Sequence, residues 1–134
     1  MPTQLESGTL RLINATPHPV TLTRADESIV TLDVGNYFHM ETFVTTTGLM
    51  DGVRVNELMH RRPVMITPTH EVLPLPSVVE SIYYLVPTLI AQYHPRSDFL
   101  TAYPIQYDWR GNPRTWELLA HDWNFPHDQL AFPV

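Results

Sequence analysis

Proline interrupts this chain so often that long helices have little room. Thirteen prolines stand among 134 residues, against only five glycines. Proline lacks the backbone N–H that a helix interior or a central strand needs. Between the prolines, apolar and polar residues alternate with the two-residue period of a strand. The chain is therefore predicted to be mostly antiparallel β-sheet.

Strand-like alternation recurs along the chain, and turn residues separate the segments. A polar turn at 25–28 joins two of them into a predicted hairpin, and Asp51-Gly52 is a strong turn signal. The leucine–proline segment at 73–76 is expected to cross the domain irregularly. The predicted strands are 9–14, 19–24, 29–34, 37–47, 52–60 and 63–68, and 103–108 and 114–120 form a second predicted hairpin.

One short α-helix is predicted over about 87–94. Pro87 suits the first position of a helix, Leu89, Ile90 and Tyr93 follow at three-to-four spacing, and Pro95 ends the pattern. One helix among many strands predicts an α+β fold in a single domain.

The single domain is predicted to span 1–134, with its core at about 9–120. The aromatic tail at 121–134 has little regular pattern, and we expect it to pack across the domain or against a partner subunit. A mostly β domain with proline-limited edges also predicts a homo-oligomer.

Charge and composition exclude several classes of protein. The net charge of −6 argues against broad nucleic-acid binding, which needs a basic surface. Cysteine is absent, so disulfides and thiolate chemistry are excluded. With neither a membrane-spanning run nor a signal peptide in view, the expected location is the cytoplasm, without membrane binding. All eight basic residues are arginine, whose planar fork suits phosphate or carboxylate recognition.

The first candidate site interrupts a strand pattern with Asn14, Thr16 and a histidine, His18, held between two prolines. Asn and Thr side chains bond nearby backbone amides, and the prolines would make the corner rigid. His18 would then project as a donor or acceptor near neutral pH. A structural turn is the alternative interpretation.

Arginines supply the second candidate. Asp98 could orient Arg96 through a bidentate pair and leave other guanidinium hydrogens for a ligand, or the two could form a plain ion pair. Arg62 is a further candidate for an anion, because at most one of the adjacent arginines 61 and 62 can face a single pocket.

Aromatic residues crowd the last third of the chain, and most are expected to fill the core. Tyr84 or Trp109 could instead stack on a base beside Arg96. The seven histidines lack HxH, HxxxH or HExxH spacing, so no metal site or other cofactor is predicted. Neither a nucleophile elbow nor a phosphate-binding glycine loop occurs, so no catalytic residue is predicted.

The ordered motifs resemble a largely uncharacterised family of small phage and actinobacterial proteins. That family opens with an INLTPH-like strand and continues through a Leu-Pro segment and a YIVS-like strand into a short helix and R-x-D. The matching residues are Ile13, Asn14, Thr16, Pro17, His18, Leu73, Pro74, Tyr84, Leu85, Val86, Arg96, Asp98, Pro104, Asp108 and Gly111. The chain departs from the pattern at Ala15, at Pro87 and in its extra aromatic tail. The phage setting implies an accessory protein that acts against host defence.

These observations predict a non-enzymatic protein that sequesters a small anionic, nucleotide-derived signalling ligand. The predicted ligand-binding residues are Asn14, Thr16, His18, Arg62, Tyr84, Arg96, Asp98 and Trp109. One alternative is a protein–protein module that inhibits a host protein or joins a virion, with the aromatic tail as its working surface. Another is a small nucleotide hydrolase or lyase with His18 as general base.

Overall fold

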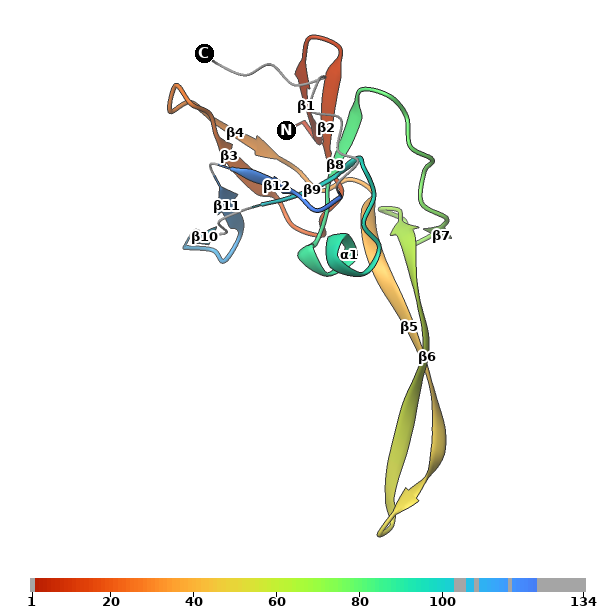
Figure 1. Ribbon diagram of the computed structural model, residues 1–134. Helices are drawn as coiled ribbons and strands as arrows, with labels where there is room; N and C mark the ends of the chain where they lie inside the picture. Colours follow the sequence, from red (N-terminus) through yellow and green to blue (C-terminus); the bar gives the residue numbers. More distant parts are fainter. Residues whose placement is uncertain (1, 103–105, 108, 116, 123–134) are drawn as a thin grey trace.

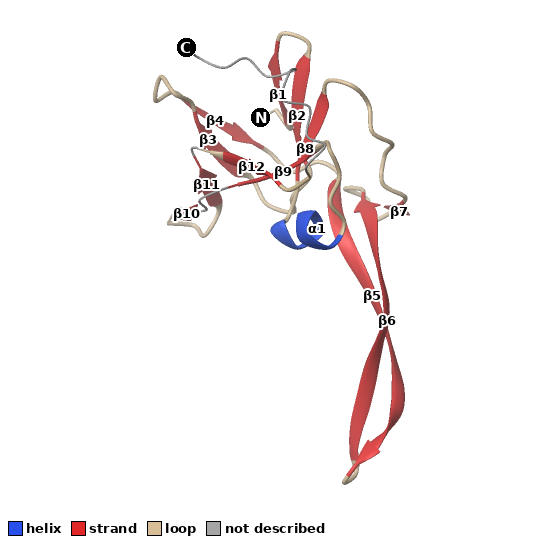
Figure 2. Ribbon diagram, viewed as in Figure 1, coloured by secondary structure: helices blue, strands red, loops and turns tan. Residues whose placement is uncertain are grey.

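The computed structural model of the chain describes residues 2–102, 106–107, 109–115 and 117–122. Strands dominate this part of the chain, together with one short helix (Figures 1 and 2). The elements are β1 (Gln4–Ser7), β2 (Leu10–Asn14), β3 (Val20–Thr23), β4 (Ile29–Leu32), β5 (Tyr37–Met50), β6 (Val53–Ile66), β7 (Val72–Leu73), β8 (Ile82–Leu85), α1 (Thr88–Tyr93), β9 (Phe99–Ala102), β10 (Gln106–Tyr107), β11 (Pro113–Thr115) and β12 (Leu118–Ala120).

The described strands form three sheets rather than the one sheet that the sequence suggested. Their orders are β1-β2-β8-β9-β12, β10-β11-β3-β4 and β5-β6-β7. Most pairings are antiparallel, as predicted, but β2–β8, β8–β9 and β11–β3 are parallel. The mostly β prediction with one short helix is therefore confirmed, and the single sheet was wrong.

Strand β8 shows why parallel pairing occurs here. Its neighbours β2 and β9 both run parallel to it, and Tyr83, Tyr84 and Leu85 are all buried. Successive residues of a strand point to opposite faces, so both faces of β8 are covered. Tyr84 joins the core cluster beneath α1, whereas Leu85 packs with Val20 and Leu32 against the second sheet. A continuous apolar run is typical of such a strand.

Helix α1 connects β8 to the parallel strand β9. Pro87 immediately precedes the helix, and the helix ends where His94 leaves helical geometry just before Pro95. Ile90 and Ala91 are buried against the core, which includes Phe38 of β5. The prediction of one helix at about 87–94 is confirmed. This crossover positions β9, a strand that the sequence analysis did not predict.

The two hairpin predictions had different outcomes. Strands β3 and β4 pair as predicted for 19–34. In the predicted second hairpin, β10 pairs with β11, but β12 pairs with β9 instead. Residues 103–105, 108, 116 and 123–134 lie outside the described part, and so does most of the predicted tail at 121–134. Within that tail, His121 Nε2 lies 2.8 Å from Thr101 Oγ1.

Strands β5 and β6 form one hairpin that is longer than the predicted strands at 37–47 and 52–60. The sequence favoured separate strands at 52–60 and 63–68, whereas β6 runs unbroken through Pro63, which faces Met40 in the register. The short strand β7 pairs only with Met65 and Ile66, so Pro63 stands where no third strand needs its missing N–H. The predicted turn at Asp51-Gly52 is confirmed, and both residues have positive φ, of 49° and 78°.

Candidate functional site

Asn14 is fully buried and bonds at both ends of its amide. Its Nδ2 donates to the carbonyl oxygens of His18, Leu32 and Asp33 at 2.9–3.2 Å. Its Oδ1 accepts the backbone N–H of Thr16 at 3.0 Å and lies 2.6 Å from the Thr16 hydroxyl. These bonds tie the turn after β2 to the end of β4, so the Asn14 side chain holds two parts of the backbone together.

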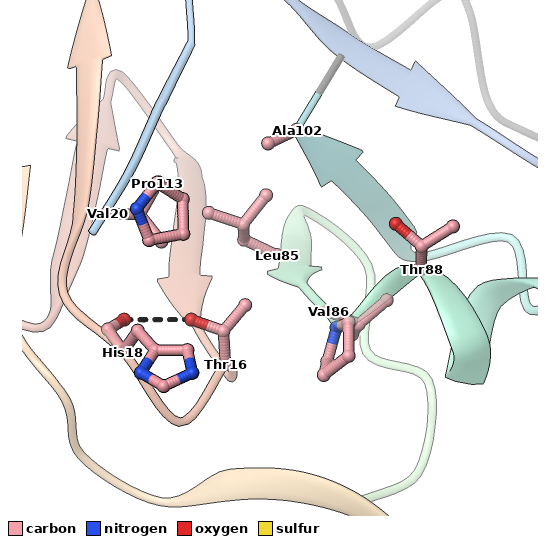
Figure 3. Close-up of a pocket in the computed structure, with 9 residues that line it drawn as sticks. Thr16, His18, Val20, Leu85, Val86, Thr88, Ala102 and Pro113 are labelled. Atoms are coloured by element: carbon pink, nitrogen blue, oxygen red, sulfur yellow. Dashed lines mark hydrogen bonds between the residues drawn. The ribbon is translucent and has the colours of Figure 1, made fainter. Parts of the chain in front are cut away.

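Thr16 and His18 line a small apolar cavity of about 110 Å³ (Figure 3). Its floor includes the buried side chains of Val20, Leu85 and Val86. The exposed residues His18 and Thr88 lie at its rim, on the turn after β2 and at the start of α1. The cavity is smaller than the roughly 300 Å³ at which pockets for drug-sized ligands begin. We call it the His18 cavity; its other lining residues are Pro87, Ala102 and Pro113.

Arg96 and Asp98 form the predicted bidentate pair. Nε and Nη2 of Arg96 donate to the two carboxylate oxygens at 2.9 and 2.6 Å. The remaining nitrogen, Nη1, donates to the Pro76 carbonyl at 2.7 Å, and the guanidinium lies 4.6 Å from the centre of the Phe99 ring. The Arg96 side chain is only 15% exposed. All three guanidinium nitrogens therefore already bond within the protein.

Tyr84 packs in the core beside this pair. Its ring centre lies 5.0 Å from that of Phe38. Burial raises the pKa of the Tyr84 phenol, and the nearby Asp98 carboxylate raises it further, while Arg96 acts in the opposite direction. The ring thus contributes to the hydrophobic core, with one edge along a separate hollow.

Arg62 and Trp109 lie apart from the other predicted residues. Arg62 is exposed on β6 and donates to Glu41 on β5 at 2.8 Å. It borders a hollow of about 380 Å³ formed with residues 63–64 and 72–75. Trp109 is 87% exposed in the loop between β10 and β11, with the Arg110 guanidinium 4.7 Å from its ring centre.

The eight predicted residues are thus distributed over separate places. Thr16 and His18 line the His18 cavity, whereas Asn14 and Tyr84 border a third hollow of about 370 Å³. That hollow has no arginine in its lining, and the hollow beside Arg62 has no aromatic ring. None of these three hollows combines an arginine with a stacking ring.

The feature that the sequence analysis missed is the outer part of the β5–β6 hairpin. Every described side chain from Thr42 to Leu58 is exposed, and the ribbon projects away from the remaining sheets (Figure 1). We call residues 42–61 the arm and residues 49–53 its tip. The signal was present, because alternating residues flank the Asp51-Gly52 turn on both sides. Pro63 concealed it by dividing the second strand into two predicted pieces.

The arm exposes large apolar side chains. Leu49, Met50 and Val53 at the tip are 70%, 71% and 67% exposed. Val44, Val55 and Leu58 follow at 62%, 41% and 43%. Met50 faces Val53 across the turn, and Val44 faces Leu58 nearer the body, so each pair shares one face of the ribbon. The Glu41–Arg62 ion pair closes the base of the arm.

Among the described residues, no group of three or more His, Asp or Glu side chains is placed to hold a metal ion. In the same residues, no helix has the length and apolar character needed to cross a membrane. A scan against protein-family models and searches of curated proteins and of solved structures found no match to this chain.

Proposed function

We propose that this protein is a non-enzymatic assembly module that associates with copies of itself through the β5–β6 arm. The observation that carries the proposal is the exposure of seven large apolar side chains on a two-stranded ribbon, namely the six named above and Phe43. In the phage setting that the resemblance implies, such a module would join a protein particle. The working surface is then the arm, whereas the protein–protein alternative from the sequence had placed that surface on the aromatic tail.

The size of the apolar surface supports this proposal. A fully exposed Val, Leu or Met side chain offers about 100 Å² of apolar area, so the six together offer on the order of 400 Å². A standard interface buries about 800 Å² per partner, and a little over half of that is apolar. One arm supplies this whole area only to a partner that encloses both of its faces, since adjacent residues such as Leu49 and Met50 point to opposite faces of the ribbon.

The backbone of the arm supports it as well. Beyond β7, the outer edges of β5 and β6 face no third strand in the described part of the chain. Natural proteins protect such edges, because unpaired N–H and C=O groups pair readily with other chains. An isolated two-stranded hairpin is also only marginally stable in water. A partner subunit that covers the arm removes both costs.

The introduction of two charges at the tip tests the proposal. The double variant Leu49→Glu with Val53→Lys replaces two exposed apolar side chains without changing the net charge. We expect the unmodified protein to sediment as an oligomer and this variant as a monomer with an unchanged circular dichroism spectrum. The matched control, Ser77→Glu with Gln92→Lys, places the same charges at exposed polar positions of the body, outside the arm, and keeps the oligomer. Equal association of all three proteins would refute the proposal.

The earlier functional hypotheses remain predictions. Sequestration of a nucleotide-derived ligand would need Arg96 to exchange its Asp98 and Pro76 partners for a phosphate. Catalysis by His18 would need a substrate at the rim of the His18 cavity. Mass spectrometry of small molecules released from the heat-denatured protein tests both, since it detects an intact nucleotide or a converted product.

A further inference from the structure

We propose that Met50, at the tip of the arm, inserts into the His18 cavity of a second copy of this chain. This inference rests on the proposed assembly function and names the surface that receives the arm. It joins the two strongest unexplained features of the molecule, an exposed apolar tip and an apolar hollow in the body beside the start of α1.

The His18 cavity has the size of one side chain. Its volume of about 110 Å³ is below the roughly 150 Å³ of an engineered apolar cavity that holds benzene. It exceeds the space of about 30 Å³ that one water molecule takes. Its floor of Val20, Leu85 and Val86 carries no polar side-chain atom, so an unbranched apolar side chain would fill it better than water would.

Met50 matches this space in shape and position. Methionine is unbranched and adapts to irregular gaps, and Met50 is 71% exposed next to the two-residue turn. A turn with positive φ at Asp51 and Gly52 is narrow, so the tip can approach a concave surface closely. Val53 shares the face of Met50 and would then cover the rim.

The rim and the tip also complement each other in polarity. Asp51 follows Met50 directly, and its carboxylate accepts hydrogen bonds. His18 is exposed at the rim and carries a ring N–H donor, while its backbone carbonyl accepts bonds from Asn14 and Thr16. With Met50 inserted, the adjacent Asp51 carboxylate would accept a hydrogen bond from the His18 ring N–H. This bond would add a directional interaction to the apolar contact.

The arm cannot reach the cavity of its own chain. Met40 is the last buried residue of β5, and the ten residues from there to Met50 span about 33 Å of extended strand. Figure 1 places the tip far from the start of α1, where the cavity lies. The contact is therefore between copies, and it is head-to-tail. Repetition of such a contact builds a ring where the rotation closes and a filament where it does not.

Disulfide trapping tests this contact, because the chain has no cysteine of its own. Val53→Cys places a thiol beside Met50 without removing it, and Thr88→Cys places one at the rim of the cavity. A preparation of each is mixed and oxidised. We expect the mixed disulfide dimer to be the main cross-linked product, since the two positions would come within the short Cβ–Cβ distance that a disulfide needs. Glu80→Cys, exposed on the body, replaces Thr88→Cys as the control and gives little product.

Other products would overturn the inference and separate it from the proposed function. A dimer of Val53→Cys with itself would show that arms pair with arms. Absence of any cross-link, with association still lost in Leu49→Glu/Val53→Lys, would place the arm on another surface. In both cases the assembly function survives. A protein that stays monomeric with and without its tip overturns both proposals.

A second variant measures the insertion itself. Met50→Ala removes the inserted side chain and should weaken self-association about 30-fold. Thr46→Ala, at an exposed polar position of the arm, should leave association unchanged. Equal dissociation constants for the two variants in sedimentation equilibrium would overturn the insertion, even if the arm still mediates assembly.

Discussion

The body and the arm of this protein are built from the same period-two pattern but differ in what covers it. In the body, β8 is buried on both faces, and the turn after β2 holds Asn14 in a set of five close polar contacts. In the arm, apolar residues as large as those of the core stand in solvent. A strand pattern therefore shows where side chains alternate, and not whether anything lies against them.

The two regions also use charge differently. The Arg96–Asp98 pair of the body is nearly buried, with a side-chain exposure of 15% and 3%, and holds a loop to the core. The Arg62–Glu41 pair at the base of the arm is 61% and 26% exposed. Breaking a buried ion pair is costly because the remaining charge stays buried without a partner. When an exposed pair is broken, water solvates the remaining charge, so the cost is small. We therefore expect substitutions in the Arg96–Asp98 pair to lower the stability of the protein much more than substitutions in the Arg62–Glu41 pair.

The largest effect is expected at Asn14. Asn14→Asp keeps the shape but turns a carboxylate oxygen toward the carbonyls of His18, Leu32 and Asp33. We expect the free energy of unfolding to fall by about 4 kcal/mol. Denaturant titration measures this fall. Asn36→Asp makes the same change at an exposed residue and should alter stability by less than about 0.5 kcal/mol. Similar losses at both positions would contradict the structural role.

Two leucines compare the body with the arm directly. Leu32 is fully buried, so Leu32→Ala should lower the free energy of unfolding by about 3 kcal/mol through lost burial and a cavity. Leu49 is 70% exposed, so Leu49→Ala should change the stability of the monomer by less than about 0.5 kcal/mol. The measurement is thermal unfolding at a concentration too low for association. A large loss at Leu49 would show that the arm packs on its own body.

The two ion pairs give a smaller contrast. Asp98→Asn removes the charge opposite Arg96 and should cost about 3 kcal/mol, at the low end for a buried pair because Arg96 keeps its bond to Pro76. Glu41→Gln, in the exposed pair, should cost less than about 1 kcal/mol. Unfolding in denaturant at low and moderate salt checks both values. A larger loss of unfolding free energy in Glu41→Gln than in Asp98→Asn would contradict this contrast between the arm and the body.

The smallest effect is a dependence on alkaline pH. Because burial first, and Asp98 second, raise the pKa of Tyr84 in the folded state, the neutral phenol is the form that the fold favours. The unfolded chain releases that proton at a pH of about 10, so the free energy of unfolding falls as the pH rises above that value. Tyr84→Phe should weaken this fall and leave stability below pH 9 nearly unchanged. An identical alkaline profile for the variant would contradict the shift.

Sequence patterns identified chemically suitable residues for the candidate site, but they did not show whether those residues lie together or keep free groups for a ligand. The bidentate geometry of Arg96 and Asp98 followed from their spacing and is present. Whether a guanidinium nitrogen remains for a ligand depended on the Pro76 carbonyl, which lies twenty residues away in the chain. Trp109 and Tyr84 are separated because β10 and β11 belong to a different sheet from β8, and no local sequence pattern determines which sheet a strand joins.

Local physics explains what the sequence determined by itself. Alternation identified β2, β3, β4 and β5, proline bounded α1 at both ends, and Asp51-Gly52 supplied the positive φ angles of a tight turn. Each of these depends on residues within a few positions of one another. The tertiary structure alone decided that β8 lies between parallel neighbours, that Asn14 and Arg96 bond inward, and that the arm leaves the body. Those outcomes depend on which distant surfaces cover each face, and alternation is the same whether a face is covered or bare.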